Sequence, residues 1–86
     1  SQAGLVVQIV SYQEYGGGDV IFTLDKAAPS CPGYWLKASD PGFKTNLSLL
    51  LMARSGKVPL IAYGADDRTW PGSSVVHCHL YALQIQ

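Results

Sequence analysis

The sequence has little charge and no excess of either sign. Its 86 residues include six Lys and Arg and six Asp and Glu, so only 14% are charged and the formal net charge is zero. Nucleic-acid-binding proteins gain most of their affinity from clustered Lys and Arg, and anionic membranes attract the same clusters. Neither nucleic acid nor a membrane surface is therefore an expected partner. Because globular domains usually carry about 25% charged residues, this surface must expose neutral or apolar groups, which favours self-association.

Long apolar runs, internal repeats and linkers are also absent. The longest apolar runs, such as residues 49–53, fall far short of the ~18–20 residues of a spanning helix, so membrane insertion is not expected. We expect one domain over residues 1–86. The chain begins Ser1-Gln2-Ala3-Gly4 without Met, as in a mature secreted protein after signal removal or a chain with an expression scar.

Cysteine is scarce, and the CxxC spacing of zinc sites does not occur. The two cysteines, Cys31 and Cys78, form either one disulfide or two inert buried thiols. A disulfide is favoured because a small domain buries little surface and gains stability from a covalent link. It would indicate an oxidising, secreted or periplasmic location.

Strand-like alternation dominates the chain. Residues 5–12 and 19–24 alternate in character and are separated by Gly16, Gly17 and Gly18, which predicts a β-hairpin. Further strands are expected at 34–37, 58–63 and 75–85, and the polar, turn-rich residues 64–74 are expected to form a loop. In the last strand the apolar phase changes near Ala82, which indicates a β-bulge.

One helix is predicted between the third and fourth strands, from Phe43 or Lys44 to Arg54. Asp40 is the expected N-cap, and Gly56 is the expected left-handed residue at the C-terminal end.

A helical wheel divides the apolar residues of this helix into two faces. The inner face is expected to contain Phe43, Leu47, Leu50 and Leu51. Leu49 and Met52 lie roughly opposite, and an outer apolar pair can mark a contact surface. We therefore expect a homo-oligomer that associates through Leu49 and Met52, with strand edges alongside.

The order β-β-β-α-β-β defines a chain that is mainly β with one helix. It matches the OB-fold, a five-stranded Greek-key barrel. The alternative is an open α+β sheet with the helix on one face. In the barrel, Cys31 and Cys78 could meet across the interior.

No group of residues has the pattern of a catalytic or metal site. His77 and His79 flank Cys78 on a strand, but a zinc site needs a third ligand, so both histidines are expected on the solvent face. No nucleophile motif such as GxSxG occurs, and neither cysteine adjoins a basic cluster. We therefore expect no metal, no cofactor and no enzymatic activity.

Several motifs resemble one protein family. They are the run Cys31-Pro-Gly-Tyr-Trp-Leu, a Leu-rich helix ending Met52-Ala-Arg-Ser-Gly-Lys, the strand Val-Pro-Leu-Ile-Ala-Tyr, Trp70, and the terminal Cys78-His-Leu-Tyr. Together they resemble the B subunits of subtilase cytotoxin and typhoid toxin. The resemblance implies a secreted bacterial OB-fold protein that forms a ring pentamer, binds sialylated glycans and carries a toxic A subunit. Those B subunits are longer at both ends, and none of their glycan-binding residues can be placed in this chain.

Aromatic and short polar side chains in the expected loops favour a sugar ligand. Rings offer an apolar face to the C–H groups of a sugar, and Asp and Arg form directional hydrogen bonds with its polar groups. The candidate glycan-binding residues are Tyr12, Tyr15, Asp66, Asp67, Arg68 and Trp70. In the alternative interpretation, Trp70 anchors its loop in the core and the three charged residues are only solvated.

These observations favour a secreted, non-enzymatic binding module. We expect an oligomeric, pentameric lectin similar to a toxin B subunit, with cell-surface glycans as ligand and an A-type toxin subunit as a further partner. The alternative is a stand-alone secreted OB-fold domain that binds or inhibits a protein and does not bind sugar.

Overall fold

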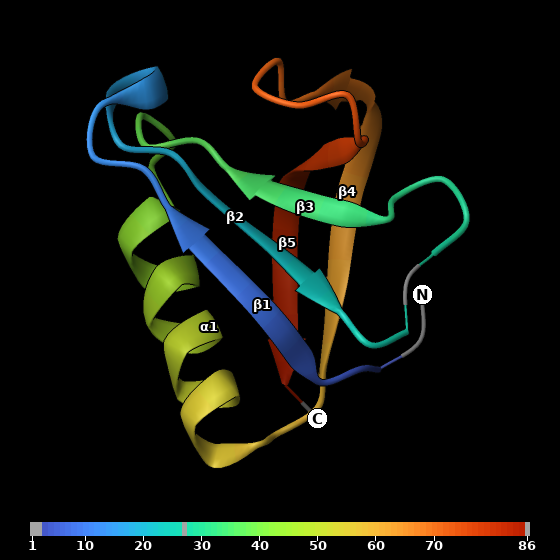
Figure 1. The fold of residues 1–86 in the computed structure, drawn as a ribbon. Helices are drawn as coiled ribbons and strands as arrows, with labels where there is room; N and C mark the ends of the chain where they lie inside the picture. Colours follow the sequence, from blue (N-terminus) through green and yellow to red (C-terminus); the bar gives the residue numbers. More distant parts are fainter. Residues whose placement is uncertain (1–2, 27, 86) are drawn as a thin grey trace.

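The fold is a five-stranded sheet with one helix. The computed structural model describes residues 3–26 and 28–85; Ser1 and Gln2, on which the expectation of signal removal rests, lie outside them. The elements in chain order are β1 (Val6–Ser11), the 3-10 turn η1 (Tyr15–Gly17), β2 (Val20–Leu24), β3 (Gly33–Leu36), α1 (Phe43–Gly56), β4 (Leu60–Thr69) and β5 (His77–Ile85) (Figure 1). The predicted order of strands and helix is confirmed.

The sheet is mixed. Its strand order is β1-β2-β3-β5-β4, with β3 parallel to β5 and the other neighbours antiparallel. The outer strands approach each other at one point, where Gly4 and Leu60 exchange two backbone hydrogen bonds of 2.9 Å. Pro59 has no N–H with which to extend this pairing. Over the residues described, the sheet therefore does not close into the predicted barrel.

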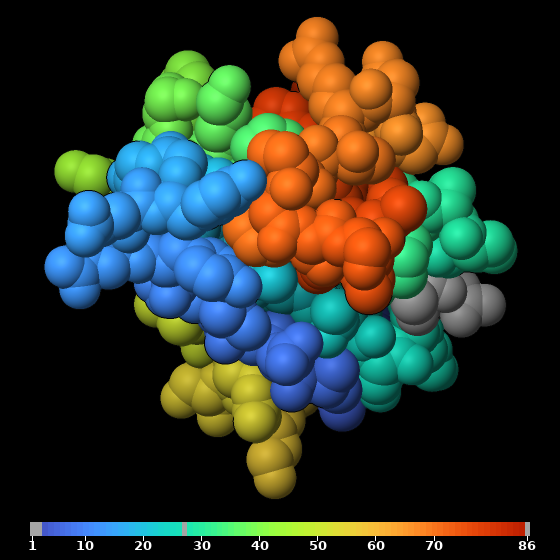
Figure 2. Space-filling view, turned by 45° about the horizontal axis from the view of Figure 1, so that its top comes forward, coloured from blue at the N-terminus to red at the C-terminus, as the bar shows by residue number. Residues whose placement is uncertain are grey.

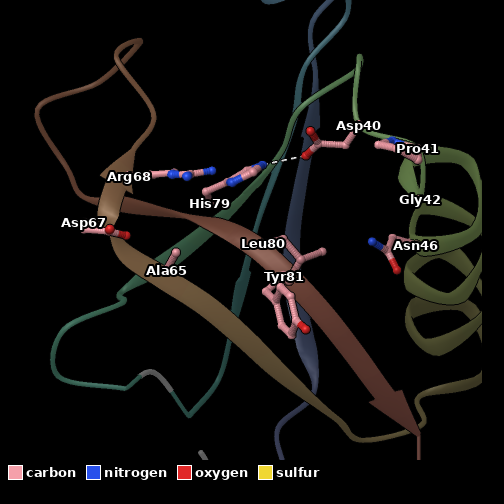
Figure 3. Close-up of a pocket in the computed structure, with 10 residues that line it drawn as sticks. All are labelled: Asp40, Pro41, Gly42, Asn46, Ala65, Asp67, Arg68, His79, Leu80 and Tyr81. Atoms are coloured by element: carbon pink, nitrogen blue, oxygen red, sulfur yellow. Dashed lines mark hydrogen bonds and ion pairs between the residues drawn. The ribbon is translucent and has the colours of Figure 1, made fainter.

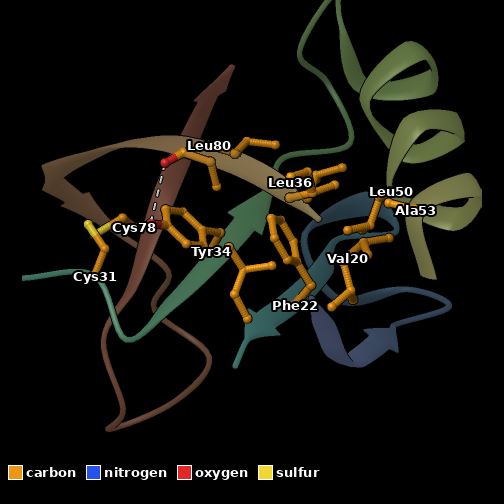
Figure 4. Close-up of a cluster of buried hydrophobic side chains, with 13 residues drawn as sticks. Val20, Phe22, Cys31, Tyr34, Leu36, Leu50, Ala53, Cys78 and Leu80 are labelled. Carbon is orange, nitrogen blue, oxygen red and sulfur yellow. Dashed lines mark hydrogen bonds between the residues drawn. A yellow bond between two sulfur atoms is a disulfide. The ribbon is translucent and has the colours of Figure 1, made fainter. Parts of the chain in front are cut away.

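The core lies between the inner face of the sheet and α1. Phe22 of β2 stacks on Tyr34 of β3 with ring centroids 5.3 Å apart, and Leu50 of α1 is fully buried beside them (Figure 4). Burial raises the pKa of the Tyr34 hydroxyl above its ordinary value of 10.0. These contacts fix α1 against the sheet.

The two cysteines form the predicted disulfide. Cys31 precedes β3 and Cys78 lies in β5, and their Cα atoms are 5.5 Å apart (Figure 4). Because Tyr34 of β3 pairs with Cys78 of β5, the disulfide lies at the parallel junction of the sheet. A disulfide is compatible with an oxidising compartment.

The fourth and fifth strands differ from the predicted ranges. β4 continues to Thr69, so Asp66, Asp67 and Arg68 belong to a strand and not to the predicted loop. Pairing with β5 extends β4, and its irregular register after Ala65 accommodates these polar residues. The bulge predicted near Ala82 is confirmed, because Tyr81 is the extra residue between the pairs Tyr63–Ala82 and Gly64–Leu80.

Both predicted helix caps are wrong. The N-cap residue is Gly42, and no side chain caps it, because the Asp40 side chain binds His79 instead. At the other end Gly56 is still helical, and Lys57 adopts the left-handed conformation at φ 53°. The backbone N–H of the residue after it, Val58, bonds to the Ala53 carbonyl and ends the helix.

The outer face of α1 also differs from the prediction. Leu51, predicted to face inward, is 51% exposed, and Ala53 is buried in its place. Leu49, predicted to face outward, is partly buried, whereas Met52 is exposed as expected. The face of α1 that packs on the sheet includes the small residue Ala53, so it is rotated relative to the face that the helical wheel predicted. Among the residues described, no helix is both long and apolar enough to span a membrane.

Candidate functional site

The structure divides the six predicted sugar-binding residues between two places. Tyr12, Tyr15 and Trp70 lie together at one end of the sheet, while Asp67 and Arg68 line a separate pocket. The sixth residue, Asp66, is exposed on β4 and lines neither.

The aromatic cluster is a structural anchor. Trp70 is only 4% exposed, and its ring centroid lies 5.3 Å from that of Tyr12 and 5.4 Å from that of Tyr15. Its Nε1 donates a 3.1 Å hydrogen bond to a carboxylate oxygen of Asp19. Figure 2 shows the β1–β2 connection, in light blue, in contact with the orange β4–β5 loop. Because the Trp70 ring is buried, it has no open face on which a sugar could stack.

The turn before β2 is shaped around the same carboxylate. Gly16 has φ 63°, and a Cβ atom there would lie 2.0 Å from an oxygen of Asp19. The second carboxylate oxygen accepts the backbone N–H of Ala38 at 3.3 Å. Gly16, one of the three glycines that predicted a turn, therefore also makes room for a buried acid.

The polar pocket lies between the N-terminal end of α1 and the bulged parts of β4 and β5. Its volume is about 490 Å³, and Figure 3 shows side chains that approach it from all three elements. The lining residues are Asp40, Pro41, Gly42, Asn46, Ala65, Asp67, Arg68, His79, Leu80 and Tyr81.

A hydrogen bond between a histidine and an aspartate forms one wall of this pocket. Nε2 of His79 lies 2.5 Å from Oδ2 of Asp40. The imidazole also packs on the indole of Trp35, with ring centroids 5.0 Å apart. This contact with two neighbours fixes the ring orientation, and Figure 3 shows the Arg68 side chain extending from β4 toward it.

Tyr81 supplies an exposed ring at the edge of the pocket. It is 82% exposed, the highest value among the large hydrophobic residues described. Tyr81 follows the buried Leu80, so alternation along β5 places it on the outer face, and the bulge leaves it without a partner in β4. Apolar C–H surface of a ligand could stack on this ring while the pocket binds its polar groups.

The predicted solvent position of the two histidines is wrong. His77 is buried against Trp70, and its Nδ1 donates to the carbonyl of Val75 at 3.0 Å. His79 is partly buried by Trp35 and Asp40. Long-range neighbours, Trp70 for His77 and Trp35 with Asp40 for His79, therefore cover both rings, which strand periodicity alone did not reveal.

The polar groups that line the pocket are a guanidinium, carboxylates, an amide and an imidazole. Within residues 3–26 and 28–85, no group of three His, Cys, Asp or Glu could hold a metal ion. Both cysteines are bonded to each other, so neither has a thiol that could act as a nucleophile. The pocket can instead exchange hydrogen bonds through a guanidinium, carboxylates and an amide.

Sequence reasoning missed four polar or aromatic residues of this pocket: Asp40, Asn46, His79 and Tyr81. One signal was available, because the change of apolar phase near Ala82 marks the bulge at which Tyr81 lies. Nothing local indicated that Asn46 of α1 would face β5.

Comparison of the chain with models of protein families, with curated proteins and with solved structures finds no match. The resemblance to toxin B subunits therefore stays a hypothesis based on sequence motifs.

Proposed function

We propose that this protein is a non-enzymatic glycan-binding module and that its ligand occupies the pocket between α1, β4 and β5. The observation that carries the proposal is an exposed aromatic ring, Tyr81, beside a pocket of about 490 Å³ lined by Asn46, Asp67 and Arg68. This combination suits a sugar, because one side of a sugar is C–H surface and its rim is hydroxyl groups.

The side chains of the pocket suit several hydroxyl groups at once. Arg68 offers donors in a planar fork, Asp67 offers acceptors, and Asn46 offers both. Asp40 is already bonded to His79, so it serves mainly to hold the wall of the pocket. The site proposed here differs from the sugar site predicted in the loops. It keeps two of the six predicted residues, Asp67 and Arg68.

We also propose that the fold is a partly open variant of the OB-fold barrel. The strand order, the parallel β3–β5 pair, the helix between β3 and β4, and the Gly4–Leu60 bridge all support it. In OB-folds the β1–β2 and β4–β5 connections lie at the same end of the barrel. The contact between Tyr15 and Trp70 brings the same two connections together in this protein.

The module acts as a secreted homo-oligomer in this proposal, with a pentameric, toxin B-subunit-like ring as the favoured assembly. The disulfide supports an extracellular or periplasmic location. Leu51 and Met52, both exposed on α1, support association through this helix, with Leu51 in place of the predicted Leu49. Weak sugar sites gain avidity when an oligomer repeats them.

A glycan array with the native protein tests the function. We expect saturable binding to a subset of glycans, and free sugars that elute the protein identify the class. Binding lost on Arg68→Ala and Asn46→Ala, with unchanged melting temperature, would assign the ligand to this pocket. Absence of binding to every glycan would exclude the proposal and favour a protein partner.

A further inference from the structure

A second concave surface lies where β1 meets the C-terminal end of α1, at the opposite end of the helix from the polar pocket. It consists of adjoining hollows of about 340 and 350 Å³ that share Leu5 and Lys57. We call this surface the β1 trough. Its lining residues are Ala3, Gly4, Leu5, Val6, Val7, Asp25, Lys26, Ala53, Arg54, Lys57 and Pro59.

The trough exposes a strand edge. Residues 3–7 line it consecutively, and in an extended chain successive side chains point to opposite faces. Residues 3–5 line one hollow and residues 5–7 the other, which is the pattern expected where the backbone edge of the strand faces the trough. β1 is an outer strand of the sheet, and after Gly4 this edge has no strand partner among the residues described.

The β1 bulge lies within the same edge. The register passes from the pair Val6–Leu24 to Gln8–Thr23, so Val7 is the extra residue and has no partner in β2. Val7 is also 53% exposed. An exposed strand edge beside an apolar hollow is a template for the addition of another strand.

The trough is also positively charged, although the whole chain is neutral. Lys26, Arg54 and Lys57 are half of the six cationic residues. Only one of the six acids, Asp25, lines the trough, and its Oδ1 accepts the N–H of Leu5 at 2.8 Å. None of these three cations forms an ion pair with a residue that the structure describes.

We propose that the β1 trough binds an extended, acidic peptide segment of another protein, which adds as a strand to β1. The peptide backbone bonds to the free edge, its apolar side chains contact the exposed Val7, and its acidic side chains reach Arg54 and Lys57. A fatty acid would leave the strand edge without hydrogen bonds. The chain's own acidic pair, Asp66 and Asp67, lies in a bulge of β4 between the pairs Ala65–His79 and Thr69–Cys78, so it is not an extended segment free to add to β1, and a second copy fits less well.

NMR titration of the isotope-labelled protein tests this proposal with a defined probe, the peptide acetyl-Thr-Val-Glu-Val-Glu-Thr-amide. We expect saturable shifts of the amide signals of Val6, Val7 and Gln8, with a dissociation constant of about 0.1–1 mM for so short a segment. The same peptide with Lys in place of Glu should bind at least about tenfold more weakly. A peptide with alternate backbone nitrogens methylated should lose binding, because it cannot complete the strand pairing.

Matched variants locate the charge requirement. The double variant Arg54→Glu, Lys57→Glu should weaken binding of the acidic peptide by about tenfold or more. Lys44→Glu, which changes an exposed cation on the first turn of α1 outside the trough, should leave it unchanged. If the double reversal lowers the melting temperature, Arg54→Gln with Lys57→Gln serves in its place.

Four results would overturn the proposal. They are no saturable shift up to about 5 mM peptide, equal binding of the Lys peptide, equal binding of the methylated peptide, and concentration-dependent shifts of the same amides without any peptide. Equal binding of the methylated peptide would indicate that apolar contacts suffice without strand pairing. Concentration-dependent shifts without peptide would indicate that a second copy of the chain occupies the trough.

Discussion

The indole of Trp70 and the carboxylate of Asp19 are joined by a 3.1 Å hydrogen bond across a sequence separation of 51 residues. Both residues are buried, and the same carboxylate also accepts the backbone N–H of Ala38. One acid therefore ties together the β4–β5 loop, the turn before β2 and the segment after β3. A buried acid with two donors is well satisfied, and the loss of either donor is costly.

Trp70 is expected to be essential for stability. Trp70→Ala removes a buried ring and should lower the free energy of unfolding by about 3–5 kcal/mol. Trp70→Phe keeps a buried ring but removes one of the two N–H donors to Asp19, at a cost of about 1–3 kcal/mol. Urea denaturation measures both, with Tyr15→Ala as the exposed control in the same cluster. Equal stability of all three variants would contradict the anchor role.

The disulfide is expected to contribute strongly to stability. Cys31 and Cys78 are 47 positions apart, and the loss of unfolded-state entropy on closing such a loop corresponds to about 4 kcal/mol in the chain-entropy model. The double variant Cys31→Ala, Cys78→Ala should lose a large part of this in urea denaturation. The intact mass without reductant should lie about 2 Da below the reduced mass. Two alkylatable thiols in the native protein would contradict the bond.

Stability should fall at alkaline pH through Tyr34. Because burial raises the pKa of this hydroxyl above 10.0, the unfolded state loses its proton first. The contribution is complete below about pH 10 and is lost as pH rises toward the folded pKa. Tyr34→Phe should therefore flatten the alkaline limb of a melting-temperature profile. At neutral pH the cost should be about 0.5–1 kcal/mol, since the one hydrogen bond that the hydroxyl forms with the described residues, to the Ala62 carbonyl, is 3.5 Å long. Tyr63→Phe, at an exposed position, is the control.

Self-association should depend on the exposed pair on α1. Light scattering is expected to give a multiple of the 9.2 kDa chain mass, and Leu51→Glu with Met52→Glu should shift the protein toward monomer, because each places a charge in an apolar contact. Thr45→Glu, on the first turn of the same helix, should leave the mass unchanged. A monomer at tens of micromolar in the unchanged protein would exclude the ring assembly.

Glycan binding should require the exposed ring of Tyr81. Tyr81→Ala should reduce affinity about tenfold or more through the loss of stacking and leave the melting temperature nearly unchanged, because the side chain is 82% exposed. Tyr63→Ala, on β4 and outside the pocket, is the control. Unchanged binding by the Tyr81 variant would place the sugar elsewhere.

Local patterns in the sequence determined the elements. Alternation of side chains predicted the β1–β2 hairpin, the Leu-rich period predicted α1, and a change of phase predicted the bulge at Tyr81. The lone cysteine pair predicted the disulfide, because two cysteines in a small domain have one way to pair. Alternation, helical period and the number of cysteines can be read from the sequence without knowledge of the tertiary structure.

Only the tertiary structure decided which of these segments meet. Asp66–Arg68 look like loop residues by composition, yet the pairs that flank them, Ala65–His79 and Thr69–Cys78, keep them within β4. Asp40 has the residue type and position of a helix cap, yet His79, 39 positions later, binds its carboxylate. Trp70 and His77 bury each other under a loop that no periodicity describes. The physical reason is the same in each case: a long-range partner satisfies a polar group or buries a ring better than the local arrangement can, and its position is set by the sheet as a whole.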